Sequence, residues 1–168
     1  MDIFYTKNKE NSGEYARKIL KERYGVRAPH LETGEFGKPY LTNAPYFFSI
    51  SHTKTLLAVA VSHTEVGLDV EDTTRSIPKS IRNRLTKQEQ NEDFFAVWTA
   101  KEAYIKYLGE TLARRYTALE YYENTLYCDK KIISVVINHV FAEDYLFCTC
   151  QKQGAADENV TMICTDET

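Results

Sequence analysis

Residues 94–106 of this chain read FFAVWTAKEAYIK, a helical apolar pattern that carries charged side chains beside the only tryptophan. Glu102 and Lys106 are four residues apart, so they share one face of the predicted helix. Charged groups close to large aromatic side chains need partners, because an isolated buried ion costs several kcal/mol. By itself the stretch is typical of a surface ion pair above a core stripe. A metal or phosphate site has to be argued from the rest of the chain.

Length and composition are those of an ordinary globular chain. It has 168 residues, of which 43% are hydrophobic and 27% charged, enough to bury one good core. A formal net charge of −3 argues against a general nucleic-acid binder, whose binding face is strongly basic. No run approaches the roughly 20 apolar residues of a membrane span, and residues 1–7 lack a signal-type apolar core. We therefore expect a cytoplasmic protein without nucleic-acid or membrane partners.

The pattern of apolar and turn residues predicts an α+β chain, consistent with two similar lobes. The four cysteines lie in the last third, mostly in strand-like runs, and in a cytoplasmic protein they are expected to be reduced and packed. The histidines lie elsewhere in the sequence, which argues against a zinc site. The predicted elements are an edge strand at 2–6, a capped helix at 12–24 before Gly25, a strand at 46–50, a helix from 86 to 107 interrupted near Asn91, and a strand-rich remainder.

Two apolar runs, residues 56–61 and 66–71, are separated by four polar residues and predict an antiparallel hairpin. Its open end would bring Glu71 close to His52, which makes His52 a site candidate. His63 would lie at the closed tip and is expected to be a solvated turn residue.

Asp69 and Glu71 lie two residues apart in a predicted strand, so both carboxylates emerge on one face. Two acids on one face repel each other, and a divalent cation relieves that repulsion. Mg²⁺ typically takes one or two carboxylates together with waters and phosphate oxygens. The pattern is also typical of an exposed strand face. Adding Glu102 and the cation of Lys106 gives the groups that a metal-bridged phosphate ester requires.

A second group of polar residues surrounds the constrained turn Gly37-Lys38-Pro39-Tyr40. It presents an ammonium group, and residues 48–52, FSISH, follow with hydroxyls and an imidazole. Together these could donate hydrogen bonds to an anion. The sequence has no Walker-type or Rossmann glycine pattern, which argues against nucleotide binding of those kinds.

Four motifs in this order resemble the 4'-phosphopantetheinyl transferase family, of the type that activates surfactin synthetase. They are Gly37–Tyr40, Phe48–Thr53, Gly67–Glu71 and Trp98–Lys106, with a weaker similarity at Asp157–Met162. The resemblance implies a single domain over residues 1–168 built as two similar small α/β lobes, approximately 1–62 and 63–168. These lobes would be related by a pseudo-twofold axis, with the first one abbreviated.

The resemblance also implies an activity, namely transfer of the phosphopantetheine arm of coenzyme A to a serine of an apo acyl or peptidyl carrier protein. Adenosine 3',5'-bisphosphate would leave, as in a holo-[acyl-carrier-protein] synthase. Asp69, Glu71 and Glu102 would hold Mg²⁺ on the pyrophosphate. Glu102 would also be the general base toward the serine, and Lys106 would neutralise charge on the leaving phosphate. A two-lobed chain can close its own site, so a monomer is expected.

The predicted contacts to coenzyme A are Lys38, Ser51, His52, Lys101 and Arg17. Arg17 belongs to a helix that begins where relatives have a longer portion with basic residues for the coenzyme A nucleotide. Arg17 is therefore either a substitute for those residues or part of an exposed helix face.

The chain departs from the family pattern at two more positions. Ser49 stands where relatives often have Asn, and Thr53 where many have Ser. The short amino-terminal portion leaves an alternative open, a homologue that binds carrier protein or coenzyme A without turnover. A third interpretation of Asp69, Glu71 and Glu102 is a metal-dependent phosphoester hydrolase.

Overall fold

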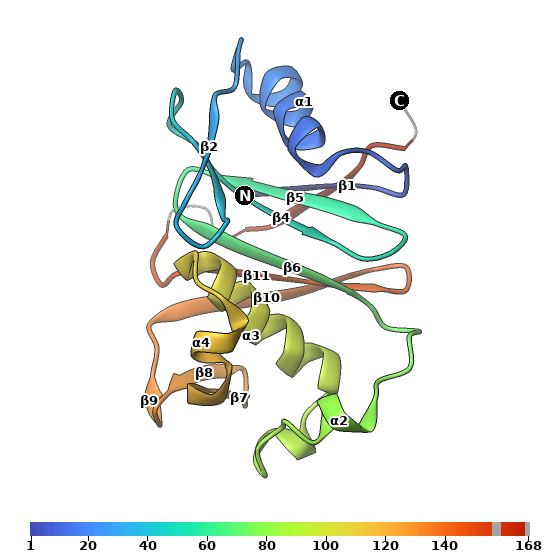
Figure 1. Cartoon of the computed structure of the whole chain (residues 1–168), viewed down its shortest axis with the longest axis vertical. Coiled ribbons are helices and arrows are strands. Elements are labelled where there is room, and N and C mark those ends of the chain that lie inside the picture. The colour runs from blue at the N-terminus through green and yellow to red at the C-terminus, as the bar shows by residue number, and fades with distance from the viewer. Residues whose placement is uncertain (156–158, 167–168) are drawn as a thin grey trace.

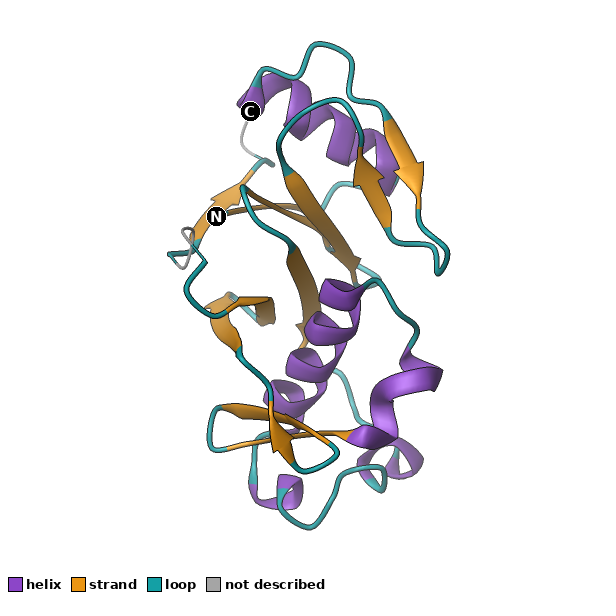
Figure 2. Ribbon diagram, turned by 90° about the vertical axis from the view of Figure 1, so that its left-hand side faces the viewer, coloured by secondary structure: helices purple, strands orange, loops and turns teal. Residues whose placement is uncertain are grey.

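The computed structural model describes residues 1–155 and 159–166 and has four layers: a helix, two sheets and a second helix (Figure 1). The first helix is α1 (Ser12–Tyr24), and the first sheet contains, in order, β12 (Thr161–Cys164), β1 (Asp2–Thr6), β5 (Leu57–Ser62) and β4 (Phe47–His52). The second sheet contains β10 (Val135–Ala142), β11 (Tyr145–Lys152) and β6 (Val66–Asp72), and its outer face is covered by α3 (Phe94–Leu108). Figure 2 shows α1 and α3 on opposite sides of the strand layers.

The shorter elements surround this stack. They are β2 (Leu31–Thr33), β3 (Pro39–Leu41), α2 (Lys79–Arg82), the 3₁₀ turns η1 (Glu89–Asn91) and η2 (Tyr116–Ala118), α4 (Leu112–Arg115), β7 (Leu119–Tyr122), β8 (Thr125–Cys128) and β9 (Lys131–Ile132). The strands β7, β8 and β9 form a small antiparallel sheet beside α3. The predicted mixed α/β architecture is confirmed. The relation of the two lobes by a pseudo-twofold axis stays a prediction.

Both long helices begin and end where their flanking residues dictate. The side chain of Asn11, rather than that of Ser12, caps α1, and Gly25 ends it in the left-handed conformation with φ 67°. Asp93 caps α3 by accepting a hydrogen bond from the amide of Ala96, and Gly109 ends it with φ 67°. The predicted interruption before α3 is confirmed by η1.

Three apolar clusters lie between the four layers. Each fully buried large side chain among them contributes about 1.5–3 kcal/mol. The first cluster joins α1 to the first sheet and contains Tyr15, Ile19, Phe4 and Val59. The second joins the two sheets and contains Ala58, Ala60, Leu68, Val70 and Phe147. The third joins the second sheet to α3 and contains Val97, Ala100, Leu146 and Cys148. The two sheets and two helices therefore hold one another in a fixed stack.

Two expectations about strands are corrected. The predicted hairpin at 56–71 is wrong, because β5 pairs with β1 and β4 while β6 pairs with β11 in the other sheet. All of β5 and the first five residues of β6 are buried, which suits strands in separate layers better than a two-stranded ribbon. The strand at residues 2–6 is not an edge, since β12 pairs parallel to it on one side and β5 antiparallel on the other. His63 is exposed in the loop between β5 and β6, as predicted.

The last strand returns to the beginning of the chain. Although β12 follows the strands of the second sheet in sequence, it lies in the first sheet. The predicted lobe boundary near residue 62 would have assigned β12 to the second lobe. Of the predicted closing motif, Asp157 and Glu158 lie outside the described residues, and Thr161 begins β12. All four cysteines, Cys128, Cys148, Cys150 and Cys164, are free thiols. In the described part of the chain, no helix is both long enough and apolar enough to cross a membrane.

Serine side chains join β4 to β6 across the boundary between the two sheets. Strand alternation turns Phe48 toward α1 and Ser49 and Ser51 toward β6. The hydroxyl of Ser49 accepts a hydrogen bond from the amide of Leu68 at 2.9 Å, and that of Ser51 accepts one from the amide of Val70 at 3.2 Å. These side chains supply the acceptors that a neighbouring strand's carbonyls would otherwise provide.

We expect Ser49→Ala to lower the free energy of unfolding by about 1–3 kcal/mol, because the buried amide of Leu68 would lose its acceptor. Denaturant unfolding measures the change. Ser80→Ala, on the exposed face of α2, is the control and should change stability by less than about 0.5 kcal/mol. Equal, small changes in both variants would contradict the role of Ser49 as a bridge between the sheets.

Candidate active site

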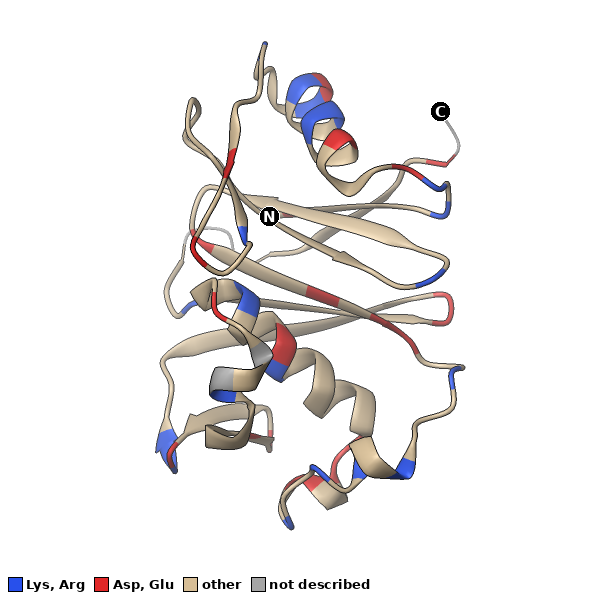
Figure 3. Ribbon diagram, in the orientation of Figure 1, with Lys and Arg blue, Asp and Glu red and all other residues tan. Residues whose placement is uncertain are grey.

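A hydrogen-bonded cluster of three side chains lies where β4, β6 and α3 meet. The ammonium of Lys106 lies 2.7 Å from Asp69 Oδ1 and 2.8 Å from Ser51 Oγ, and the Ser51 hydroxyl lies 3.0 Å from the same carboxylate oxygen. Acidic positions lie along β6 beside α3, the helix that carries Lys106 (Figure 3). The structure therefore brings Ser51, a predicted coenzyme A contact, together with Asp69, a predicted metal ligand, and Lys106.

The second carboxylate oxygen of Asp69 has a different environment. The residue is 5% exposed, and Oδ2 is buried without a hydrogen-bond partner among residues 1–155 and 159–166. A buried carboxylate oxygen without a donor is costly, so such atoms commonly receive a ligand, an ion or a proton. Asp69 thus presents one lone-pair-bearing oxygen to the site while Lys106 binds the other.

Glu102 lies on α3 one turn before Lys106. Burial raises the pKa of its carboxyl to about 7, and repulsion from Asp69 adds to the rise, while Lys106 opposes it. In the described part of the chain its side chain forms no hydrogen bond or ion pair. A carboxylate whose pKa lies near neutrality suits proton transfer, because it is partly ionised and still basic.

Glu71 lies two residues after Asp69 and is already partnered. Burial raises the pKa of its carboxyl, whereas a hydrogen bond from Arg75 lowers it. The Arg75 Nε donates to Glu71 Oε2 at 2.9 Å, and the guanidinium carbon lies 5.5 Å from the ring centroid of Phe95. The arginine therefore competes with any metal for one oxygen of Glu71.

The three predicted metal ligands do not form a preorganised metal cage. In the described ranges, no three histidine, cysteine, aspartate or glutamate side chains converge as metal ligands. The donor chemistry nevertheless suits Mg²⁺, since Asp69 Oδ2 is buried and unpartnered and Glu102 repels Asp69 and Glu71 electrostatically. Binding of a cation would relieve that repulsion. Ligation by Asp69, Glu71 and Glu102 stays a prediction.

Lys101 has a structural role that the sequence did not predict. Its ammonium lies 2.6 Å from Glu89 Oε1, and the exposed fractions of the two side chains are 1% and 0%. The ammonium also lies 4.5 Å from the ring centroid of Tyr116, and burial lowers the Lys101 pKa. A contact with coenzyme A would require Lys101 to leave this ion pair.

Glu89 forms a capping box with Thr86. Its carboxylate accepts hydrogen bonds from the amides of Thr86 at 2.9 Å and Tyr121 at 2.8 Å. The hydroxyl of Thr86 accepts from the amide of Glu89, which completes the capping box.

Lys38 lies outside the Ser51, Asp69 and Lys106 cluster. Its ammonium pairs with Glu65 and donates to the carbonyls of Val66 and Tyr107, each at 3.2 Å. These contacts tie the turn at residues 37–40 to the start of β6 and the end of α3. The role of Lys38 as a coenzyme A contact stays a prediction.

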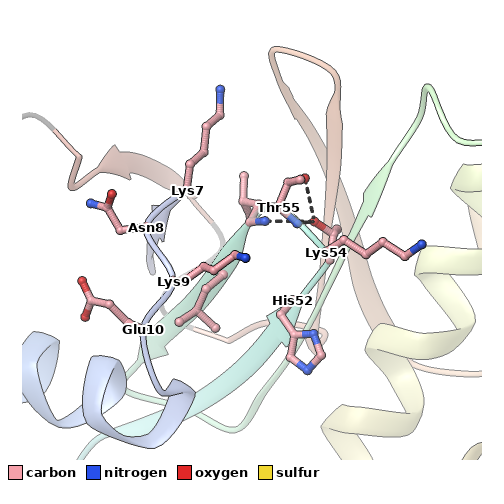
Figure 4. Close-up of a pocket in the computed structure, with 10 residues that line it drawn as sticks. Lys7, Asn8, Lys9, Glu10, His52, Lys54 and Thr55 are labelled. Atoms are coloured by element: carbon pink, nitrogen blue, oxygen red, sulfur yellow. Dashed lines mark hydrogen bonds between the residues drawn. The ribbon is translucent and has the colours of Figure 1, made fainter.

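His52 lies on the opposite face of β4 from Ser51 and lines a separate cleft (Figure 4). The cleft is lined by Lys7–Glu10 and His52–Leu57. Arg17 is exposed on α1 and is not among the cleft residues. The basic residues of the cleft include Lys7 and Lys9 in the loop before α1. The sequence analysis considered only Arg17 on the helix, although Lys-Asn-Lys at residues 7–9 precedes it.

The mixed α/β fold brings the buried acid Asp69 and Lys106 together where β4, β6 and α3 meet. A family model described as the 4'-phosphopantetheinyl transferase superfamily matches residues 65–150, about half of the chain. The chain belongs to this superfamily of transferases. The match includes β6 and α3, which carry Asp69, Glu102 and Lys106.

Individual relatives agree with this family. The 4'-phosphopantetheinyl transferase psf-1 of Bacillus pumilus is 28% identical, over 88% of this chain and 72% of the relative. The 4'-phosphopantetheinyl transferase Sfp of Bacillus subtilis is 28% identical over 58% of this chain, and AcpT of Salmonella typhimurium is 30% identical over 56%. The chain spans 50% of Sfp and 57% of AcpT.

Proposed function

We propose that this protein transfers the 4'-phosphopantetheine arm of coenzyme A to a serine hydroxyl of an apo acyl or peptidyl carrier protein. Adenosine 3',5'-bisphosphate is the second product, as for a holo-[acyl-carrier-protein] synthase. One observation carries the proposal: Lys106, Asp69 and Ser51 form a cluster beside the carboxylate of Glu102, which is held at a pKa of about 7. The names of the relatives support the same reaction.

In this reaction the carrier serine is the nucleophile. Glu102 accepts its proton, directly or through a water, as the serine oxygen attacks the phosphorus that bears the pantetheine arm. The bond from that phosphorus to the bridging oxygen breaks, and the electron pair leaves with adenosine 3',5'-bisphosphate. Lys106 lies where it can neutralise the charge on the leaving phosphate, a contribution that depends on position more than on covalent chemistry.

The cofactor of this proposal is Mg²⁺, which Asp69, Glu102 and Glu71 would hold, with Arg75 competing for one oxygen of Glu71. When bound, such a cation neutralises pyrophosphate oxygens and orients them. Ser51 fixes Asp69 and the Lys106 ammonium in one arrangement, so the carboxylate does not rotate away from the ligand. We further propose that the chain acts as a monomer of two related lobes, with the site at their boundary.

The proposal is tested by incubating the protein with coenzyme A, Mg²⁺ and an apo carrier protein, and weighing the carrier by mass spectrometry. We expect a mass gain equal to one phosphopantetheine group, and none when Asp69→Asn replaces the wild type. Chelation of Mg²⁺ by EDTA is expected to stop the reaction, and added Mg²⁺ to restore it.

Three results are distinguishable in the same assay. A mass gain supports the transferase. Binding of coenzyme A without a gain on several acyl and peptidyl carriers would contradict it and favour a binding homologue. Breakdown of coenzyme A without any carrier would instead indicate a phosphoester hydrolase.

A further inference from the structure

Two cations of the protein bind the acids Asp69 and Glu71 of β6. The ammonium of Lys106 lies 2.7 Å from Asp69 Oδ1, and the Nε of Arg75 donates to Glu71 Oε2 at 2.9 Å. Each of these carboxylates therefore has one oxygen in contact with a positive charge. Asp69 Oδ2 is buried and has no partner among the residues that the structure describes, which leaves this oxygen for a ligand.

Arg75 comes from the loop after β6 and is held in place from two sides. Its guanidinium carbon lies 5.5 Å from the ring centroid of Phe95, in the first turn of α3. The turn before it is shaped by Asp72, whose carboxylate accepts hydrogen bonds from the amide of Thr74 at 2.9 Å and from its hydroxyl at 2.6 Å. The exposed fractions of the Arg75 and Glu71 side chains are 32% and 18%, so solvent screens the pair only in part. The arginine is therefore a fixed part of the site.

The hydrogen bond from Arg75 limits how Glu71 can bind a metal. An oxygen that accepts from a guanidinium is a poor metal ligand, because a metal ion would meet a second positive charge at the same atom. Asp69 is limited in the same way by Lys106. The two acids of β6 thus offer single oxygens rather than both oxygens of a carboxylate.

Mg²⁺ and Ca²⁺ differ in the oxygens that they require. Mg²⁺ demands a nearly ideal octahedron and usually combines one or two carboxylates with waters and phosphate oxygens. Ca²⁺ takes about six to eight oxygens in a flexible arrangement and often uses both oxygens of a carboxylate. Single carboxylate oxygens therefore suit Mg²⁺ better than Ca²⁺.

We propose that Arg75 determines metal selectivity: by holding Glu71 Oε2 it makes the site prefer Mg²⁺ to Ca²⁺. The inference rests on the proposed function, which takes Mg²⁺ as the cofactor. Arg75 lies outside the four motifs shared with the transferase family, so the resemblance does not predict this role. Because it acts through Glu71, Arg75 is a positioning residue and does not touch the reacting atoms.

The test measures binding of Mg²⁺ and of Ca²⁺ to the protein alone, as displacement of Mn²⁺ followed by electron paramagnetic resonance. Arg75→Met keeps an unbranched side chain against Phe95 but has no donor. We expect it to move the ratio of the two dissociation constants about 10-fold toward Ca²⁺, the lower end of the effect of a hydrogen bond to a charged group, because the pair is partly exposed. The ratio is decisive, since loss of a positive charge alone would tighten both divalent ions to the same degree. Arg82→Met is the matched control and should leave the ratio unchanged, because the Arg82 guanidinium lies 5.8 Å from the ring centroid of Phe94, the neighbour of Phe95.

A second variant tests whether Arg75 acts through Glu71. Adding Glu71→Gln to Arg75→Met removes the carboxylate that the arginine restrains, so we expect the ratio to return toward the wild-type value. A shift that persists in this double variant would overturn the inference. So would an unchanged ratio in Arg75→Met, even if both ions bind more tightly, or the absence of divalent-ion binding in every variant.

These measurements need neither coenzyme A nor a carrier, which separates the two proposals. A shifted ratio in a protein that transfers no phosphopantetheine would contradict the proposed function alone. Transfer by a protein whose ratio does not shift would contradict the role of Arg75 alone.

Discussion

Glu102→Gln is expected to remove transfer activity while stabilising the metal-free protein. The amide cannot accept the serine proton, so kcat should fall by about 10²-fold to 10⁴-fold. The same change replaces a carboxylate whose ionisation is opposed by burial and by Asp69. Loss of activity together with a higher free energy of unfolding would show that the Glu102 carboxylate needed for transfer also destabilises the folded protein.

The pH dependence of the stability gain follows from the direction of the pKa shift. The Glu102 pKa is about 7 in the folded protein against an ordinary value of 4.5, so folding favours the protonated carboxyl. The wild type therefore loses stability as pH rises from about 4.5 to 7, and glutamine, which stays neutral, does not. We expect the variant to exceed the wild type by about 1–3 kcal/mol at pH 8 and to match it near pH 4.5.

Denaturant unfolding in EDTA at both pH values measures this difference. Glu22→Gln, on the exposed face of α1, is the control and should change neither stability nor transfer appreciably. Retained transfer in Glu102→Gln would exclude Glu102 as the base. A variant no more stable than the wild type at pH 8 would show that the buried carboxylate imposes no cost on folding.

The sequence predicted the centre of the site better than its surroundings. Strand periodicity places Asp69 and Glu71 on one face, and helix periodicity does the same for Glu102 and Lys106. The family resemblance, not periodicity, joined the two pairs in one site. Periodicity does not say which strand pairs with which, and the predicted hairpin failed because two buried strands adjacent in sequence joined different sheets. Ser49 and Ser51 bridge those sheets, a function that no local pattern encodes.

Long-range packing also decided the roles of the lysines. Lys101 and Lys106 lie on one helix, yet the first is buried against Glu89 and the second reaches Asp69. Glu89 lies before the helix, and only the fold brings it under α3.

Gly67→Ala is expected to disrupt both the fold and the site, because β6 and α3 touch through their backbones at this residue. A Cβ at residue 67 would lie 1.9 Å from the carbonyl oxygen of Ala103 and 2.4 Å from the amide nitrogen of Tyr107. Neither atom belongs to a flexible side chain, so α3 as a whole must move away. We expect the free energy of unfolding to fall by about 3 kcal/mol or more.

The displacement of α3 should also lower activity in the molecules that remain folded. Glu102 and Lys106 lie on α3 and Asp69 on β6, and a shift of about 1 Å can cost about 10²-fold in rate. Transfer measured well below the unfolding midpoint, normalised to the folded fraction, separates this effect from unfolding. Gly13→Ala is the matched control, since its Cβ would meet only side-chain atoms at 3.4 Å and alanine favours the helix. Full specific activity in folded Gly67→Ala would mean that the acids and Lys106 keep their arrangement without the close contact of strand and helix.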